Sequence, residues 1–151
     1  KMIIRKHRLW EVFLVDKLQF NWDEVHDVAE ELEHIKSEKL INALDAFLGY
    51  PKEDPHGDPI PNANGEIAVR EKELLSEVDL NYDYMCVGVK DTSSAFLQYL
   101  DRQNIALGST FKVLKHELFD HSITIYYKEV EMTLSKVVAQ NLFVKKIEHV
   151  R

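Results

Sequence analysis

The feature that most constrains this chain is a nine-residue segment, from His26 to His34, that sets two imidazoles and two carboxylates at helical spacing. At about 100° per residue, these four side chains fall within an arc roughly 100° wide. The apolar residues of the segment centre on the other side, so the pattern predicts an amphipathic helix that runs to about Lys36. The acidic arc is either an ordinary solvated surface or half of a metal site. Its members are His26, Glu30, Glu33 and His34.

A second His–Glu pair, His7 and Glu11, lies in a predicted opening helix from Lys1 to Leu18. Both residues fall on the most apolar arc of that helix, where an unpaired charge is costly. A cation shared with the acidic arc would satisfy them, and an ordinary hydrogen bond between the two side chains is the alternative. The apolar arc comprises Ile3, Ile4, Trp10, Leu14 and Leu18, and the predicted solvent side comprises Lys1, Arg5, Arg8 and Asp16.

Composition excludes several classes of protein. With 151 residues, of which 45% are hydrophobic, the chain can bury one good core or two small ones. It has no apolar run of membrane-spanning length and no signal-type leader, so we expect a cytoplasmic protein without membrane association. The net charge of −7 argues against direct binding of nucleic acid by this chain. The single cysteine, Cys86, excludes an intrachain disulfide and a cysteine-based zinc site.

Further helix signals follow the acidic arc. Asn21 is a candidate N-cap of the second helix, and Ser37 is one for a third helix that ends at Gly49 and Pro51. The third helix carries an apolar stripe that needs a partner surface, so we expect the chain to form a homodimer. The stripe comprises Leu40, Ile41, Leu44, Phe47 and Leu48.

The amino-acid composition changes after residue 50. Residues 51–66 are rich in Pro, Gly, Asp and Asn and are predicted to form an ordered loop, in which we interpret His56 as structural because no ligand stands four residues away. Beyond the loop, short β-branched and aromatic runs predict strands and a small barrel. The predicted strands cover 84–90, 110–114, 122–128 and 142–147, and one helix covers 94–103.

Together these patterns predict an α+β chain of two domains, a helical metal-binding domain over 1–66 and a barrel over 67–151. The six candidate ligands offer three imidazoles and three carboxylates without sulfur, a set that suits Mn(II), Fe(II), Co(II) or Zn(II) and leans toward Mn(II). Two ions close together are possible. The candidate ligands are His7, Glu11, His26, Glu30, Glu33 and His34.

At these residues the chain resembles the metal-dependent transcriptional repressors of the diphtheria toxin repressor type. The resemblance runs through Arg5-Lys6-His7-Arg8-Leu9-Trp10-Glu11, through the segment from Val25 to His34, and through Asp54-Pro55-His56-Gly57-Asp58-Pro59-Ile60-Pro61. It implies that the helices carry metal ligands, including all six candidates, and the dimer interface. It also implies that the chain from about Leu74 is an SH3-like domain of the FeoA type. A carboxylate at Glu30, where iron-type members have cysteine, is typical of manganese-type members.

Two departures from the family qualify this expectation. The sequence begins inside a predicted helix, so we expect that the family's winged helix-turn-helix domain is missing and that operator DNA would be bound only through that domain. Where some members offer ligands from the SH3-like domain, this chain has Val87 and Lys90, and a role for Asp91 is left open. We therefore expect the metal-sensing and dimerisation fragment of a Mn(II)- or Fe(II)-dependent repressor, with no small-molecule substrate.

Two other functions compete with this interpretation. A di-metal carboxylate enzyme could use the same ligands, but it would need an acid/base pair or nucleophile that the sequence does not offer. The SH3-like part could instead be a peptide-binding adaptor, which would need exposed aromatic residues along a groove. The candidates for that groove, which could equally be core residues, are Tyr82, Tyr84, Tyr126 and Tyr127.

Overall fold

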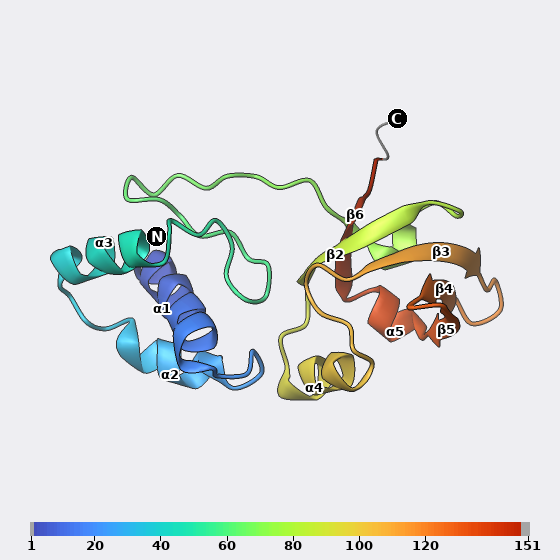
Figure 1. Ribbon diagram of the computed structural model, residues 1–151, viewed down its shortest axis with the longest axis horizontal. Helices are drawn as coiled ribbons and strands as arrows, with labels where there is room; N and C mark the ends of the chain where they lie inside the picture. The colour runs from blue at the N-terminus through green and yellow to red at the C-terminus, as the bar shows by residue number, and fades with distance from the viewer. Residues whose placement is uncertain (1, 149–151) are drawn as a thin grey trace. The chain divides into compact units, whose positions relative to one another are not determined.

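The computed structural model describes residues 2–148; Lys1, which we predicted in the first helix, and residues 149–151, at the end of the predicted barrel domain, lie outside the described residues. The chain divides into two compact units (Figure 1). The first holds the residues up to Arg70 together with Ser93–Gln98, and the second holds Glu71–Thr92 and the residues from Tyr99 onward. Within the described part of the chain, no helix combines the length and the apolar character needed to cross a membrane.

Three helices build the first unit: α1 (Met2–Leu18), α2 (Val25–Leu32) and α3 (Glu38–Phe47). Helix α1 packs against both α2 and α3 (Figure 1). Their apolar faces meet in one buried cluster, which the loop residue Ile60 completes. The buried members from the helices are Leu9, Trp10, Val12, Leu14, Val25, Ala29, Ile41 and Leu44.

Helix α2 is shorter at both ends than the sequence predicted. It ends at Leu32, with Glu33 as its C-cap, so the prediction that it continues to about Lys36 was wrong. The chain must leave the helix early because Ser37 is extended and caps α3, its hydroxyl oxygen accepting a hydrogen bond from the Leu40 N–H at 3.1 Å. His34 therefore lies in the turn after the helix.

The N-cap residue of α2 is Glu24, whose side chain makes no capping hydrogen bond, and not Asn21 as predicted. The Asn21 N–H donates to the Glu24 carboxylate at 2.9 Å, and the Glu24 N–H donates to the Asn21 carbonyl at 3.1 Å. Asn21 thus opens a turn that precedes the helix. The side chain that reaches back belongs to the glutamate three residues later.

The prediction that Arg5 lies on the solvent side of α1 was also wrong. Only 2% of Arg5 is exposed, because its guanidinium group donates to Asp45 at 2.9 Å and to Asn42 at 3.2 Å, both on α3. Only part of the predicted apolar arc is buried; Ile3 is 46% exposed and Ile4 is 42% exposed. Helical periodicity identifies a face, but the pairing of Arg5 with Asp45 decides which face is covered.

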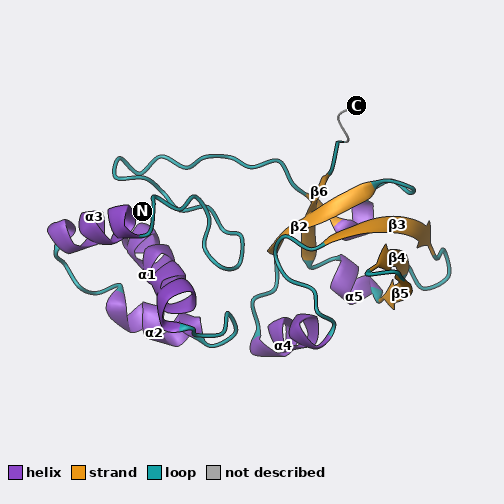
Figure 2. Ribbon diagram, viewed as in Figure 1, coloured by secondary structure: helices purple, strands orange, loops and turns teal. Residues whose placement is uncertain are grey.

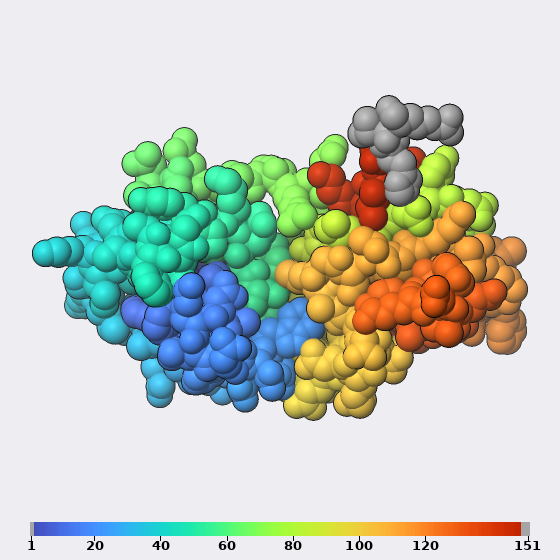
Figure 3. Space-filling model, in the orientation of Figure 1, coloured from blue at the N-terminus to red at the C-terminus, as the bar shows by residue number. Residues whose placement is uncertain are grey.

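Apolar surface remains uncovered on the first unit. Phe47, which belongs to the predicted stripe of α3, is 63% exposed, and Leu40 of the same stripe is 39% exposed. The start of α1, drawn in blue, also lies open at the surface in the space-filling view (Figure 3). Exposed apolar residues in such number are typical of a surface that binds another protein chain.

The loop after α3 folds into a closed turn. The Asp54 N–H donates to the Asp58 carbonyl at 2.8 Å, and a β-bridge joins Glu53 to Pro59. Gly57 has a φ of 88°, a conformation that glycine adopts without strain. Arg8 of α1 donates a hydrogen bond to the Pro59 carbonyl, so the turn is held against the helix that carries His7 and Glu11.

The second unit is a six-stranded antiparallel sheet in the order β1-β6-β2-β3-β4-β5 (Figure 2). It contains a short 3-10 helix (Leu75–Glu77), a helix α4 (Ser94–Arg102) whose later residues belong to this unit, and a helix α5 (Lys136–Ala139). The strands are β1 (Glu73–Leu74), β2 (Asp83–Val89), β3 (Thr110–His116), β4 (Ile123–Tyr127), β5 (Val130–Leu134) and β6 (Leu142–Lys146).

The predicted α+β class is confirmed, and four of these strands lie where the sequence predicted them. Strands β1 and β5, at the two edges of the sheet, were not predicted. Edge strands need no continuous apolar pattern, and β5 has Glu131 and Thr133 among its apolar residues. Cys86 is 1% exposed in β2, and burial raises the pKa of its thiol to about 11. It is a small core residue, as predicted.

Candidate metal centre

Helix α1 presents His7 and Glu11 one turn apart on the face that meets α2. The His7 Nε2 atom lies 3.3 Å from the Glu11 carboxylate, and Glu11 is only 3% exposed. The sequence predicted that this pair would be buried and would need partners. The structure supplies those partners from two directions.

The first partner is His26, at the start of α2. Its ring centroid lies 4.9 Å from that of His7, and ligand atoms of His7, Glu11 and His26 all lie within 4.8 Å of one another. Helices α1 and α2 thus bring together three of the six predicted ligands. The two His–Glu patterns of the sequence therefore meet at His7, Glu11 and His26.

Glu33 approaches the same group from the end of α2. Its carboxylate lies 2.6 Å from the Nδ1 atom of His7, so His7 bonds a carboxylate through each ring nitrogen. The hydrogen bond to Glu11 is the main reason that the pKa of His7 lies above its ordinary value; burial opposes this rise, and Glu33 adds to it. The two carboxylates thus both favour the protonated form of His7.

Glu30 and His34 lie farther out. Glu30 pairs with His26 at 3.3 Å, but these two side chains are 61% and 66% exposed. Within residues 2–148, neither Glu30 nor His34 joins a group of three closely spaced ligand atoms. Both stay predicted ligands on an open face of the first unit.

A second group of potential ligands was not predicted from the sequence. Glu11, Asp54 and His56 are all buried, and their ligand atoms also lie within 4.8 Å of one another. The His56 Nδ1 atom is 3.8 Å from Glu11 and 4.0 Å from Asp54. The Asp-Pro-His-Gly-Asp turn was a usable signal, since it places a carboxylate and an imidazole two residues apart. Its position against Glu11 could not be read from spacing.

The pKa values of the two buried carboxylates, Asp54 and Glu11, shift in opposite directions. Burial, and then the neighbouring Glu11, raise the pKa of Asp54 to about 8. Burial also pushes the pKa of Glu11 upward, but hydrogen bonds from His7 and Asp54 and the nearby imidazoles outweigh it, so the pKa of Glu11 lies below its ordinary value. Around neutral pH, Asp54 carries a proton that it shares with the ionised Glu11.

This arrangement fits a divalent metal ion. Carboxylate oxygens and imidazole nitrogens converge on Glu11 without sulfur, the donor set of Mn(II), Fe(II), Co(II) and Zn(II). Buried acceptors this close together need a shared proton or a cation between them. The proton on Asp54 meets that need, and a bound cation would meet it equally well.

The raised pKa of Asp54 predicts a pH dependence of stability. The folded protein holds this proton up to about pH 8, whereas the ordinary value is 3.8, so stability is greatest at low pH and falls as pH rises across this interval. The slope should approach, at most, about 1.4 kcal/mol per pH unit. The raised pKa of His7 acts in the same direction, and the lowered pKa of Glu11 acts in the opposite direction only near its ordinary value of 4.5 or below.

Urea unfolding in the presence of a chelator, from about pH 5 to pH 8, would measure this slope. We expect Asp54→Asn to remove most of it and Asp16→Asn, which changes an exposed carboxylate on α1, to leave it intact. An unchanged slope in Asp54→Asn would mean that Asp54 does not hold the proton.

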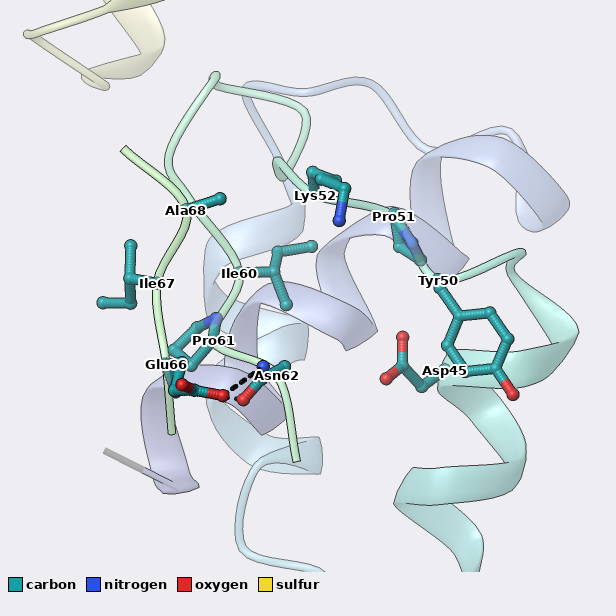
Figure 4. Close-up of a pocket in the computed structure, with 10 residues that line it drawn as sticks. All are labelled: Asp45, Tyr50, Pro51, Lys52, Ile60, Pro61, Asn62, Glu66, Ile67 and Ala68. Atoms are coloured by element: carbon teal, nitrogen blue, oxygen red, sulfur yellow. Dashed lines mark hydrogen bonds between the residues drawn. The ribbon is translucent and has the colours of Figure 1, made fainter. Parts of the chain in front are cut away.

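A pocket of about 330 Å³ lies elsewhere in the first unit, between the end of α3 and the segment 60–68 (Figure 4). Its buried carboxylate belongs to Asp45, which is already paired with Arg5. Glu66 accepts a hydrogen bond from Asn62 at 3.1 Å across its rim. Both carboxylates of the pocket are thus already paired, so the group around Glu11 is the better candidate for metal binding.

Comparisons with known proteins bear on both units. Residues 1–62 match the metal binding and dimerisation domain of iron dependent repressors, and residues 74–146 match the FeoA domain. Over 59 residues the chain is 48% identical to a probable metal transport system membrane protein of Chlamydia trachomatis, covering 39% of this chain and 13% of that protein. It is 44% identical over 59 residues to the iron-dependent repressor IdeR of Mycobacterium bovis, covering 39% of this chain and 26% of the repressor.

The chain thus spans about a quarter or less of the length of these curated relatives. A solved structure of a manganese-dependent transcriptional repressor in complex with manganese is similar over nearly the whole chain. The two are 35% identical with a TM-score of 0.88, and the match covers 97% of this chain and 70% of that one.

Proposed function

Because the chain belongs to the family of metal-dependent transcriptional regulators of the diphtheria toxin repressor type, we propose that it is the metal-sensing and dimerisation part of a repressor controlled by Mn(II) or Fe(II). The observation that carries this proposal is the buried carboxylate of Glu11 between two groups of potential ligands. The family consists of transcriptional repressors and not of enzymes, so the comparisons do not support a di-metal enzyme.

We propose two metal sites. The first would be centred on Glu11, with His7 and His26 on one side and Asp54 and His56 on the other. The second would use the remaining predicted ligands on α2 and its C-terminal turn. The 2.6 Å contact between Glu33 and His7 supports a link between the two sites, because Glu33 belongs to the second set and touches the first. The second set comprises Glu30, Glu33 and His34.

Mn(II) is the favoured effector in this proposal. The ligand set is rich in carboxylates and contains no sulfur, which favours hard ions of high coordination number. Manganese is bound in the similar repressor structure, while the mycobacterial relative is named for iron, so Fe(II) is the second candidate. Co(II) and Zn(II) would serve as laboratory substitutes.

A metal bound across α1 and α2 would favour one relative position of these helices by its higher affinity for that position. In a parent repressor, a DNA-binding domain joined to α1 would then be held at the spacing of two operator half-sites in the dimer. Operator DNA would be contacted through that domain alone. The exposed apolar residues of α1 and α3, such as Ile3 and Phe47, support a homodimer in which these helices meet.

The chlamydial relative raises a second possibility, that the parent is a membrane transport protein. That match is confined to 59 residues of this chain and to 13% of the relative. The similarity to the manganese-dependent repressor covers both units. The repressor is therefore the better-supported parent.

Titration of the protein with Mn(II) tests this function. We expect specific binding that weakens at least about tenfold in Glu30→Ala and in His34→Ala, since each removes a proposed ligand. Glu31→Ala is the matched control, because it removes an exposed carboxylate from the same helix. Equal Mn(II) affinity in the three variants and the original protein would contradict the assignment of the second site.

A further inference from the structure

Two of the imidazoles near Glu11, those of His7 and His56, form hydrogen bonds to different partners on the side away from Glu11. The Nδ1 atom of His7 lies 2.6 Å from the carboxylate of Glu33, and its Nε2 atom faces Glu11 at 3.3 Å. In His56 the roles of the nitrogens are reversed. Its Nε2 atom lies 2.7 Å from the main-chain carbonyl of Trp22, and its Nδ1 atom faces Glu11 at 3.8 Å.

These contacts determine where each neutral ring carries its hydrogen. A carbonyl oxygen only accepts, so Nε2 of His56 must be the protonated nitrogen and donate to Trp22. A carboxylate also only accepts, and Glu33 is the nearer of the two carboxylates to His7, so Nδ1 of His7 donates to Glu33. Each ring then directs its lone pair inward.

Asp54 is oriented in a comparable way. Its Oδ1 atom accepts hydrogen bonds from the main-chain N–H groups of His56 at 2.8 Å and Asp58 at 2.9 Å. The Oδ2 atom is therefore left to face His56 at 4.0 Å. The turn from Asp54 to Asp58 thus presents one oxygen and one nitrogen toward Glu11 before any ion arrives.

We propose that Glu33 and the Trp22 carbonyl are positioning groups that hold His7 and His56 in opposite tautomers, so that Nε2 of His7 and Nδ1 of His56 are the ligand atoms of the Glu11 site. The choice of metal-binding atoms rests on the proposed function, but the tautomers do not. Outer hydrogen bonds of this kind fix ring orientation and raise the basicity of the ligating nitrogen. The site is therefore preorganised at the level of single atoms.

Nitrogen-15 NMR of the histidine rings in chelator-treated protein, in alkaline buffer, tests the tautomers directly, because protonated and unprotonated ring nitrogens differ widely in chemical shift. We expect a protonated Nε2 in His56 and a protonated Nδ1 in His7. His116 is an internal control, since its Nε2 bonds the Val78 carbonyl at 2.7 Å and it lies outside the site. The same tautomer in His7 and His56 would overturn the proposal.

Addition of Zn(II), a diamagnetic ion, then identifies the ligand atoms. We expect the resonances of Nε2 in His7 and Nδ1 in His56 to shift, while those of His116 stay in place. A shift at the opposite nitrogens would overturn the proposal even though metal binds. Opposite tautomers with no response to Zn(II) would instead contradict the proposed function of the Glu11 site and leave the positioning by Glu33 and Trp22 supported.

Discussion

Replacing Glu11 by glutamine should reduce the affinity for Mn(II) at least about 100-fold, a larger loss than at any other proposed ligand. Glu11 is the one residue common to both groups of ligand atoms found among the described residues, so its loss affects His7 and His26 as well as Asp54 and His56. Glutamine keeps the size of the side chain and removes its charge. The expected effect is therefore electrostatic, with little change in packing.

Equilibrium dialysis against Mn(II), or the electron paramagnetic resonance signal of free Mn(II), would measure this loss. Glu31→Gln is the matched control, because it makes the same chemical change at an exposed position on α2. Circular dichroism would confirm that both variants are folded. If Glu11→Gln bound Mn(II) as tightly as Glu31→Gln, the buried carboxylate would not be a ligand.

Asp45→Ala should cost about 3–5 kcal/mol of unfolding free energy, the typical penalty for breaking a buried ion pair. Arg5 is 2% exposed, and Asp45 is its charged partner at 2.9 Å. The Nε atom of Arg5 already has no hydrogen-bond partner among the described residues. Removing the carboxylate would leave a buried positive charge beside the neutral Asn42 side chain, and alanine supplies no second anion to compensate it.

The double variant Arg5→Met with Asp45→Leu separates charge from packing. Replacing both members of a buried pair by apolar residues is often neutral, so we expect it to recover most of the lost stability. Arg70→Ala is the control for an exposed pair, since it breaks the 3.3 Å contact with Glu53 and should cost under about 1 kcal/mol.

Urea unfolding of these variants must be compared at one protein concentration, because dimerisation would add to the apparent stability. Equal stability of Asp45→Ala and Arg70→Ala would show that the Arg5–Asp45 pair contributes no more than a surface contact. The pairing with Asp45 would then not explain why Arg5 is buried.

The sequence allowed the candidate site to be predicted in part. His7, Glu11 and His26 were expected to meet, and the structure brings them together. His56 was interpreted as structural because it has no ligand one helical turn away. Its partner is Glu11, 45 residues earlier in the chain, and local spacing holds no information about such a contact.

The fold was predictable to a similar extent. The Ser37 cap and the four inner strands follow from local signals, namely a side-chain acceptor at a helix start and runs of β-branched and aromatic residues. The early end of α2 and the edge strand β5 did not follow, because both depend on neighbouring structure. Arg5 shows the same limit, since its burial requires Asp45 on another helix.

By itself, the sequence determined which donor groups the chain offers, namely imidazoles and carboxylates at helical spacing on two helices. The tertiary structure decided which of these groups are buried and paired, with Glu11 at the centre and Glu30 and His34 on an open face. The reason is physical. Side-chain direction within a helix is set locally, whereas the cost of burying a charge is met only by groups that folding brings from distant parts of the chain.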